Sequence, residues 1–216
     1  MKRQIFSVVI GCVCLSAFVL GCGSTPPPAK TAAPVQPYGT YDASLAFRDD
    51  ATTNTKVTGA NFLPQFLDRE GKTVKLKDYH GMKNVALFFM RGMTRSPGGL
   101  CPTCSAQTSR LVANLAEFAK RDTEVLIIFP GEKQHAAEFA AKIQKDGDGK
   151  AMPIPVLLDE DFKAVDRLGI RGDSAKPSTF LFDKAGQVRF AYVGATTADR
   201  PSLAAIYKQL DDMAKP

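Results

Sequence analysis

Two cysteines in the middle of the chain, Cys101 and Cys104, are the residues best suited to covalent chemistry. They are separated by two residues, and such a C-x-x-C pair can be a redox dithiol, a structural disulfide or half of a metal site. The three other cysteines lie in or just after an apolar segment near the amino end. The chemistry open to the pair therefore depends on the elements that position it and on the compartment in which it works.

The amino end has the pattern of an export signal. Two basic residues precede the apolar run 5–20, which is shorter than the roughly 20 residues that a helix needs to cross a bilayer. The sequence from Val19 to Cys22 resembles the lipobox of bacterial lipoproteins, which implies acylation of the Cys22 thiol and cleavage just before it. We therefore expect a signal peptide over 1–21 and attachment to membrane lipid through Cys22. An ordinary secretory signal cut near the same place is the alternative.

The segment that follows is rich in proline, alanine and threonine. Such a composition buries too little apolar surface to offset the entropy lost when a chain becomes ordered. We therefore expect a flexible tether over 22–57 and one folded domain over 58–216. Export and acylation would attach this domain to a membrane of the cell envelope, on an exported face where disulfides persist.

The overall composition is that of an ordinary globular domain. The chain has 216 residues, of which 44% are hydrophobic and 23% are charged. Its formal net charge is +6, but basic and acidic residues are interleaved, and no basic run with aromatic residues stands out. This pattern argues against a nucleic-acid partner.

The local pattern places the cysteine pair at the start of a helix. The apolar run 84–90 predicts a buried strand, and the glycine- and proline-containing stretch 91–100 predicts a loop. Pro102 then stands where the first turn of a helix tolerates proline. Free N–H groups and the helix dipole favour a thiolate on Cys101, whereas Cys104 lies one turn further in and is more shielded. We therefore predict that Cys101 is the more acidic thiol.

The other elements alternate between strands and helices. Hydrophobic periodicity predicts a hairpin at 66–76, a long helical segment at 102–119, strands at 124–129, 154–158, 179–183 and 188–193, and helices at 132–145, 160–168 and from 201 onward. This order predicts a single α/β domain whose central sheet is covered on both faces.

The order of these elements around a C-x-x-C pair resembles a thioredoxin-like fold, with a central mixed β-sheet flanked by helices and an N-terminal β-hairpin extension. Several phrases resemble the alkyl hydroperoxide reductase and thiol-specific antioxidant branch of that fold, the peroxiredoxin-like redoxins. They are Asp68–Asp78, Phe88-Phe89, Leu100–Thr103 and Lys176–Asp183, with Asp199–Ser202 as a lesser marker. The resemblance covers about 58–216.

The resemblance implies roles for individual residues. Cys101 would be the attacking cysteine and Cys104 the resolving one, with Pro102 and Thr103 completing the motif. Pro177 would be the cis-proline that faces the dithiol, although an X-Pro bond is usually trans.

Two alignments of the peroxiredoxin motif Pro-x-x-x-Thr/Ser-x-x-Cys stay open. Counting from Pro97 makes Cys104 the peroxidatic residue and puts Cys101 in the place of the Thr. Aligning Leu100–Thr103 with the corresponding sequence motif of the family makes Cys101 peroxidatic instead. In both alignments the residues expected around a peroxide are incomplete.

Two arginines are candidates for the positive charge of such a site. The family arginine that binds peroxide is replaced here by Pro177, and Arg171 is a possible substitute. Arg95, in the loop before the cysteines, could strengthen the field at the helix start, but it is equally well explained as a solvated residue.

We therefore predict a thiol-dependent oxidoreductase that reduces disulfides in the cell envelope and is recharged by an unidentified thiol electron donor. The alternative is a thiol peroxidase that uses the same cysteines on hydrogen peroxide or alkyl hydroperoxides. A metal-binding module is the minor, non-enzymatic alternative, since His80 and His135 could join the two cysteines to give a set of two Cys and two His ligands. Their spacing from Cys104 is unlike that of a zinc finger, and no metal or cofactor is expected.

Overall fold

The computed structural model describes residues 47–57, 65–93, 99–147 and 149–215. The expected signal peptide, the acylated Cys22, most of the expected tether, Arg95 and Pro97 lie outside the described residues. Within the described ranges, no helix is both long enough and apolar enough to cross a membrane.

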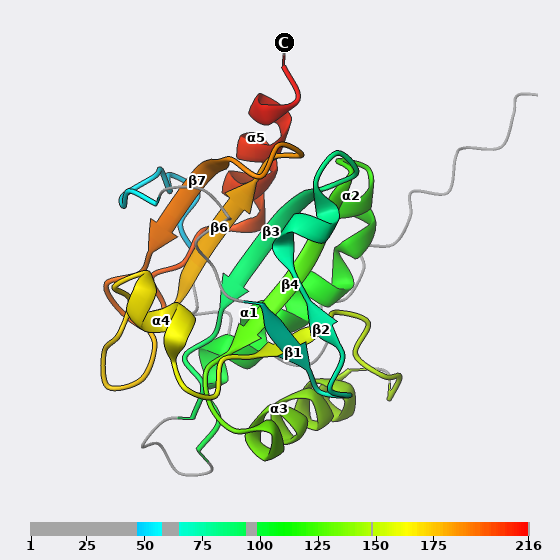
Figure 1. Ribbon diagram of the computed structural model, residues 1–216, viewed down its shortest axis with the longest axis vertical. Helices are drawn as coiled ribbons and strands as arrows, with labels where there is room; N and C mark the ends of the chain where they lie inside the picture. The colour runs from blue at the N-terminus through cyan, green and yellow to red at the C-terminus, as the bar shows by residue number, and fades with distance from the viewer. Residues whose placement is uncertain (1–46, 58–64, 94–98, 148, 216) are drawn as a thin grey trace, which may run out of the picture. The chain divides into compact units, whose positions relative to one another are not determined.

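A seven-stranded mixed sheet forms the centre of the domain, in the order β2-β1-β5-β4-β3-β6-β7 (Figure 1). The strands are β1 (Phe66–Asp68), β2 (Thr73–Val74), β3 (Asn84–Phe89), β4 (Thr123–Phe129), β5 (Val156–Leu158), β6 (Ser178–Phe182) and β7 (Val188–Val193). β3, β4 and β5 run parallel, whereas β1 and β6 pair antiparallel with β5 and β3. The predicted mixed sheet and its N-terminal hairpin are confirmed.

Helices cover both faces of this sheet. They are α1 (Pro102–Ala113), α2 (Leu115–Ala119), α3 (Lys133–Asp146), α4 (Lys163–Arg167) and α5 (Leu203–Met213), and a 3-10 turn, η2 (Leu76–Tyr79), follows the hairpin. The single helical segment predicted over 102–119 is divided at Asn114, whose backbone φ of −121° leaves the helical region. Periodicity did not reveal the break because Phe118, in α2, returns to the core that α1 covers.

Alternate residues of β3 enter two separate cores, because successive side chains of a strand point to opposite faces. Ala86 and Phe88 pack in the core formed with α1, α2, α3 and α5, whereas Leu87 and Phe89 pack in the core beneath α4. All four side chains are fully buried. Since β4 and β6 flank β3, the strand has no exposed side, and this explains its unbroken apolar sequence.

Residues 47–54, which we call the strap, pack against the domain. Ala51 is buried in the core, and the strap's backbone bonds to β7 and to the segment before α5, as the cyan chain beside β7 shows (Figure 1). The predicted start of the folded domain at residue 58 was therefore wrong. Composition did not reveal the strap because backbone hydrogen bonds, which any sequence can make, provide much of its attachment.

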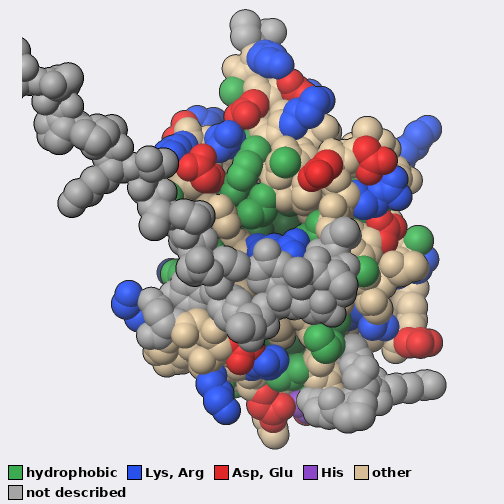
Figure 2. Space-filling model, turned by 180° about the vertical axis from the view of Figure 1, so that it is seen from behind, with side chains coloured by type: hydrophobic (Ala, Val, Ile, Leu, Met, Phe, Trp, Pro, Cys, Tyr) green, Lys and Arg blue, Asp and Glu red, His purple; other side chains and the backbone are tan. Residues whose placement is uncertain are grey.

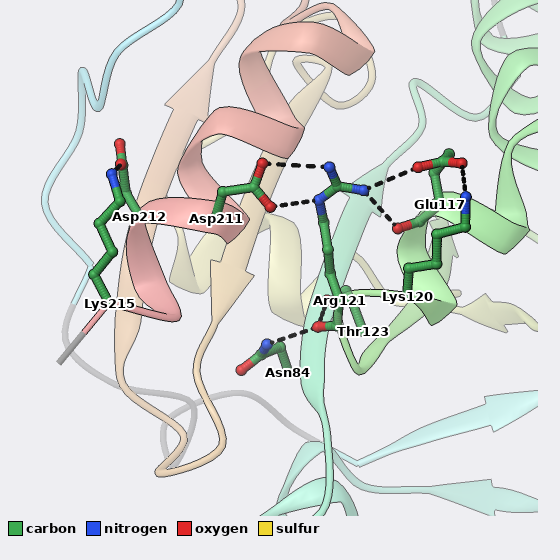
Figure 3. A network of polar contacts seen from close by, with 8 residues as sticks. All are labelled: Asn84, Glu117, Lys120, Arg121, Thr123, Asp211, Asp212 and Lys215. Atoms are coloured by element: carbon green, nitrogen blue, oxygen red, sulfur yellow. Dashed lines mark hydrogen bonds and ion pairs between the residues drawn. The ribbon is translucent and has the colours of Figure 1, made fainter.

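A polar network centred on Arg121 closes the end of the sheet at which β3 and β4 begin (Figure 3). The Arg121 Nε donates to Asp211 at 2.7 Å, and its Nη1 donates to a Glu117 carboxylate oxygen at 3.2 Å. Its carbonyl accepts a hydrogen bond from the Asn84 side chain at 3.1 Å. The network joins α2 to α5 at the amino end of β3, whereas the cysteine pair follows the carboxyl end of that strand.

Charged side chains of both signs are interspersed on the face seen from behind (Figure 2). Within the described residues, several are joined in ion pairs along one helix, such as Lys142 with Asp146 on α3. A surface of this kind favours solubility.

Candidate functional site

The cysteine pair lies beyond the carboxyl end of β3, where the chain turns from the sheet into α1. The Arg91 carbonyl accepts hydrogen bonds from the Ser174 hydroxyl and from the Ala175 N–H. Gly92 has a φ of +75°, and a Cβ at this position would lie 2.1 Å from the Pro130 carbonyl oxygen. Only glycine fits there, and the turn is thereby held close to the end of β4.

Cys101 is the N-cap residue of α1, as its place before Pro102 predicted. Its Sγ accepts a hydrogen bond from the Cys104 N–H at 3.4 Å, and Pro102 occupies the first helical position. Pro102 is exposed, whereas Thr103 is buried. The side chains of Cys101 and Cys104 are both buried, and both sulfurs are free thiols.

Cys104 has the more polar surroundings of the two. Its Sγ accepts a hydrogen bond from the Arg91 N–H at 3.4 Å and another from Nη2 of Arg200 at 3.2 Å. Arg200 is itself 1% exposed, which is exceptional for an arginine. Its other guanidinium nitrogens donate to the Thr197 carbonyl, at 2.9 Å, and to the Gln107 side-chain oxygen. The cation is thus held in a fixed position against one sulfur.

These contacts separate the acidities of the two thiols. Burial acts to raise the pKa of Cys104, but the hydrogen bond from Cys101, the charge of Arg200 and the Arg91 N–H outweigh it, so that the pKa falls below its ordinary value. The pKa of Cys101 is raised, because its thiol donates to the Cys104 sulfur and because it is buried. Cys104 therefore ionises first, and its thiolate faces a buried cation.

The prediction that Cys101 is the more acidic thiol was wrong. The helix start supplies an N–H to the Cys101 sulfur, as expected. Cys104, however, receives the hydrogen bond from Cys101 and the charge of a buried guanidinium, and such a charge acts more strongly than a partial dipole charge. That charge belongs to Arg200, which is 96 residues from Cys104 in the chain. The sequence marked Asp199–Ser202 only as a family phrase, so the role of Arg200 was missed, as was that of Gln107.

Pro177 supports the turn that holds Arg200. No peptide bond between described residues is cis, so the expected cis-proline at Pro177 was wrong. Pro177 is buried, and its carbonyl accepts the Gly194 N–H at 2.8 Å. A Cβ on Gly194 would lie 2.1 Å from the carbonyl oxygen of Asp199, the residue before Arg200. The Pro177 loop and the Arg200 turn are therefore in close contact through a glycine.

Arg171, the other candidate cation, is engaged elsewhere. Its guanidinium forms a bidentate ion pair with Asp166 and lies 4.4 Å from the centre of the Phe162 ring. These partners are in and beside α4, on the face of the sheet opposite α1. Among the described residues, the guanidinium that contacts a cysteine is therefore that of Arg200.

The histidines considered for a metal site lie on different elements. His80 ends η2 and lies against Gly186, between β6 and β7, whereas His135 is in α3. Among the described residues, no three His, Cys, Asp or Glu side chains gather in a way that could hold a metal ion.

Comparisons with known proteins agree with this arrangement of elements. A sequence model of the AhpC/TSA family matches residues 54–191, which is more than half of the chain. Peroxiredoxin Bcp of Escherichia coli K12 is 25% identical over 134 residues, which cover 58% of this chain and 77% of the relative. The thiol-disulfide oxidoreductase ResA of Geobacillus thermodenitrificans is 26% identical over 151 residues, which cover 68% of this chain and 76% of the relative.

Solved structures show the same fold. Peroxiredoxin Q of Xanthomonas campestris superposes with a TM-score of 0.57 and 20% identity, over 72% of this chain and 94% of that structure. The mixed sheet, the cysteine pair at the start of α1 and the match over most of the domain lead to one assignment. This chain is a thioredoxin-fold oxidoreductase of the AhpC/TSA family.

Proposed function

We propose that this chain is a thiol peroxidase in which Cys104 attacks the hydroperoxide and Cys101 resolves the product. The observation that supports this most directly is the contact between the buried Arg200 guanidinium and the Cys104 sulfur at 3.2 Å. This is the alignment that counts the motif from Pro97. It reverses the roles expected for the cysteines and favours the second of the two reactions predicted from the sequence.

The burial of both sulfurs supports a small substrate. Cys101 is 3% exposed and Cys104 is 2% exposed, so a disulfide held in a folded protein has little access to either. Attack on a disulfide requires contact with a sulfur along the S–S axis, whereas a hydroperoxide needs only one small oxygen to enter. Peroxide reduction therefore requires less rearrangement of the site than disulfide exchange does.

The chemistry balances with the two cysteines and an external thiol. The Cys104 thiolate attacks the terminal peroxide oxygen, an S–O bond forms and the O–O bond breaks, and the leaving alkoxide or hydroxide takes a proton from solvent. The charge of Arg200 stabilises the thiolate and the oxygen anion that develops. The Cys101 sulfur then displaces hydroxide from the sulfenic acid, and the released proton and hydroxide form water. Two electrons from the thiol donor reduce the resulting Cys101–Cys104 disulfide.

Thiol-disulfide exchange remains the second candidate, because the C-x-x-C pair begins a helix and the thiol-disulfide oxidoreductase ResA is among the relatives. In that reaction an exposed Cys101 would have to attack first. The raised pKa and burial of Cys101 argue against this order.

Single-turnover reactions of Cys101→Ser and Cys104→Ser with hydrogen peroxide distinguish these functions. We expect Cys101→Ser to consume one equivalent of peroxide and to accumulate a sulfenic acid on Cys104, which dimedone labelling and mass spectrometry detect. Cys104→Ser should leave the peroxide unreacted over the same time.

The reverse result would assign the peroxidatic role to Cys101. If the unsubstituted chain turned over insulin disulfides but not peroxide, the exchange reaction would replace the proposal. Both variants keep a small side chain of similar size, so thermal unfolding serves as the control for an intact fold.

A further inference from the structure

The strap, residues 47–54, is joined to the site through the backbone of Arg200. The Arg48 N–H donates to the Arg200 carbonyl at 2.8 Å, and the Arg48 carbonyl accepts the Ser202 N–H at 2.9 Å. Arg48 and Pro201 thereby pair as a parallel bridge. The two bonds flank Pro201 and hold the chain between Arg200 and the start of α5, where the Ser202 side chain caps the helix.

Three further contacts anchor the strap on either side of Arg48. The Arg110 guanidinium, on α1, lies 4.3 Å from the centre of the Phe47 ring. Ala51 is 5% exposed and packs in the core that contains both cysteines. At the far end, Asn54 bonds to β7 through its backbone N–H, which donates to Ala191, and through a side chain that both donates to and accepts from the Val193 backbone.

The segment that carries Arg200 needs such support. It runs from the end of β7 to the start of α5 without regular secondary structure of its own. The guanidinium nevertheless has to stay at 3.2 Å from the Cys104 sulfur, and a charge–charge interaction in a buried site weakens when the chain shifts. Gln107 and the Thr197 carbonyl fix the tip of the side chain, whereas the strap fixes its backbone.

We propose that the strap is a positioning element for the peroxide-reducing site: the backbone pairing of Arg48 with Arg200 and Ser202 keeps the Arg200 guanidinium on Cys104. Residues 47–54, which lie within the segment expected to be a membrane tether, thus set the reactivity of the thiolate. The inference rests on the proposed function for its effect on rate, but its effect on the acidity of Cys104 does not depend on which substrate reacts.

The test replaces Arg48 by proline in the full chain, because proline removes the N–H that donates to the Arg200 carbonyl. Asp50→Ala is the matched control. It removes the exposed ion pair between Arg48 and Asp50 and leaves the backbone of Arg48 unchanged. Arg48→Ala removes the same ion pair and also keeps the backbone donor, so it should behave like the control.

Two readouts follow the site. The first is the titration of Cys104 by thiolate absorbance near 240 nm in a Cys101→Ser background, and the second is the rate of peroxide reduction. We expect Arg48→Pro to raise the pKa of Cys104 and to slow the reaction about tenfold below that pKa, since one pKa unit changes the thiolate fraction about tenfold there. Asp50→Ala should leave both unchanged.

A double substitution separates positioning from general destabilisation. In an Arg200→Met background, Arg48→Pro should not raise the pKa of Cys104 further, because the charge that the strap positions is already absent. If Arg48→Pro fails to fold, Asn54→Ala, which loosens the other end of the strap, takes its place.

An unchanged titration of Cys104 in folded Arg48→Pro would overturn the inference and leave the strap as a cover for the edge of β7. If neither the unsubstituted chain nor any of the variants reduced peroxide, the proposed function would fail. The titration would then still decide whether the strap positions Arg200.

Discussion

The sulfur of Cys104 and the guanidinium of Arg200 are the pair of groups that sets the reactivity of this site. A buried cation is costly unless it is well bonded, and here Gln107, the Thr197 carbonyl and the cysteine sulfur each accept from it. This bonding keeps the charge in place in the reduced enzyme, before any substrate arrives. In the proposed reaction Cys101, one helical turn earlier, keeps its proton until it resolves the sulfenic acid, in keeping with its raised pKa.

Replacing Arg200 by methionine should raise the pKa of Cys104 and move the pH profile of peroxide reduction to higher pH. Below the original pKa, we expect the rate to fall at least about tenfold, because the thiolate loses the positive charge that contacts its sulfur. Stopped-flow measurements across pH 5 to 9 would check this. Arg200→Lys keeps a positive charge, so its pH profile should lie between those of the unsubstituted chain and Arg200→Met. Equal profiles for all three chains would rule out a role for the charge.

The same substitution should change how stability depends on pH. The pKa of Cys104 is lower in the folded chain than in the unfolded chain, so its ionisation stabilises the fold fully above the unfolded pKa of about 8.5. That stabilisation is lost as the pH falls through the folded pKa. The difference in unfolding free energy between the unsubstituted chain and Arg200→Met should therefore be larger at pH 9 than at pH 5.

At the scale of elements, the site is assembled where three segments meet. β3 ends at the turn that leads to Cys101, α1 begins there, and the segment between β7 and α5 brings Arg200 to the same place. The close approach of the Pro177 loop to the Asp199 carbonyl depends on the missing side chain of Gly194. This backbone contact, together with the hydrogen bonds that the Asp199 carboxylate accepts from the Tyr192 hydroxyl and the Ala195 N–H, fixes the segment that holds Arg200.

Gly194→Ala should therefore both destabilise the fold and weaken the site. The added Cβ would overlap backbone atoms that cannot move independently, and we expect a loss of about 1–3 kcal/mol in unfolding free energy together with a higher pKa of Cys104. Denaturant unfolding and thiolate titration measure the two effects. Gly172→Ala, where the nearest atom lies at an ordinary 3.8 Å, is the control and should change neither.

At the scale of the whole molecule, a catalytic domain is joined at its amino end to a strap and, beyond it, to the segment with the expected lipid anchor. We propose that Cys22 carries the lipid and holds the enzyme at a membrane of the cell envelope. The family assignment agrees with a peroxide substrate and a thiol donor, and attachment would place both reactions near that membrane.

Cys22→Ser tests this attachment. We expect the unsubstituted chain to incorporate labelled fatty acid and to sediment with membranes, and the variant to lose the label and to appear in the soluble fraction. Peroxide reduction by the purified variant should be unchanged, since the proposed reaction uses other thiols. Retention of the label by Cys22→Ser would contradict the proposal.

The order of strands and helices was predictable from the sequence because it follows from local periodicity. The run 84–90 has the apolar character of an enclosed strand, and Pro102 marks the beginning of α1, so local sequence is sufficient to place the cysteine pair at a helix start. Local patterns also gave the correct bounds of β7.

Only the tertiary structure decided which sulfur ionises, which arginine acts on it and where the folded domain begins. The sequence by itself established a dithiol at a helix start, since residues a few positions apart determine that geometry. The positive charge beside Cys104 belongs to Arg200, and the strap is held by bonds to β7 and to the segment before α5, both distant in the chain. Buried electrostatics depends on distances of a few ångströms between such segments, and spacing along a sequence does not contain those distances.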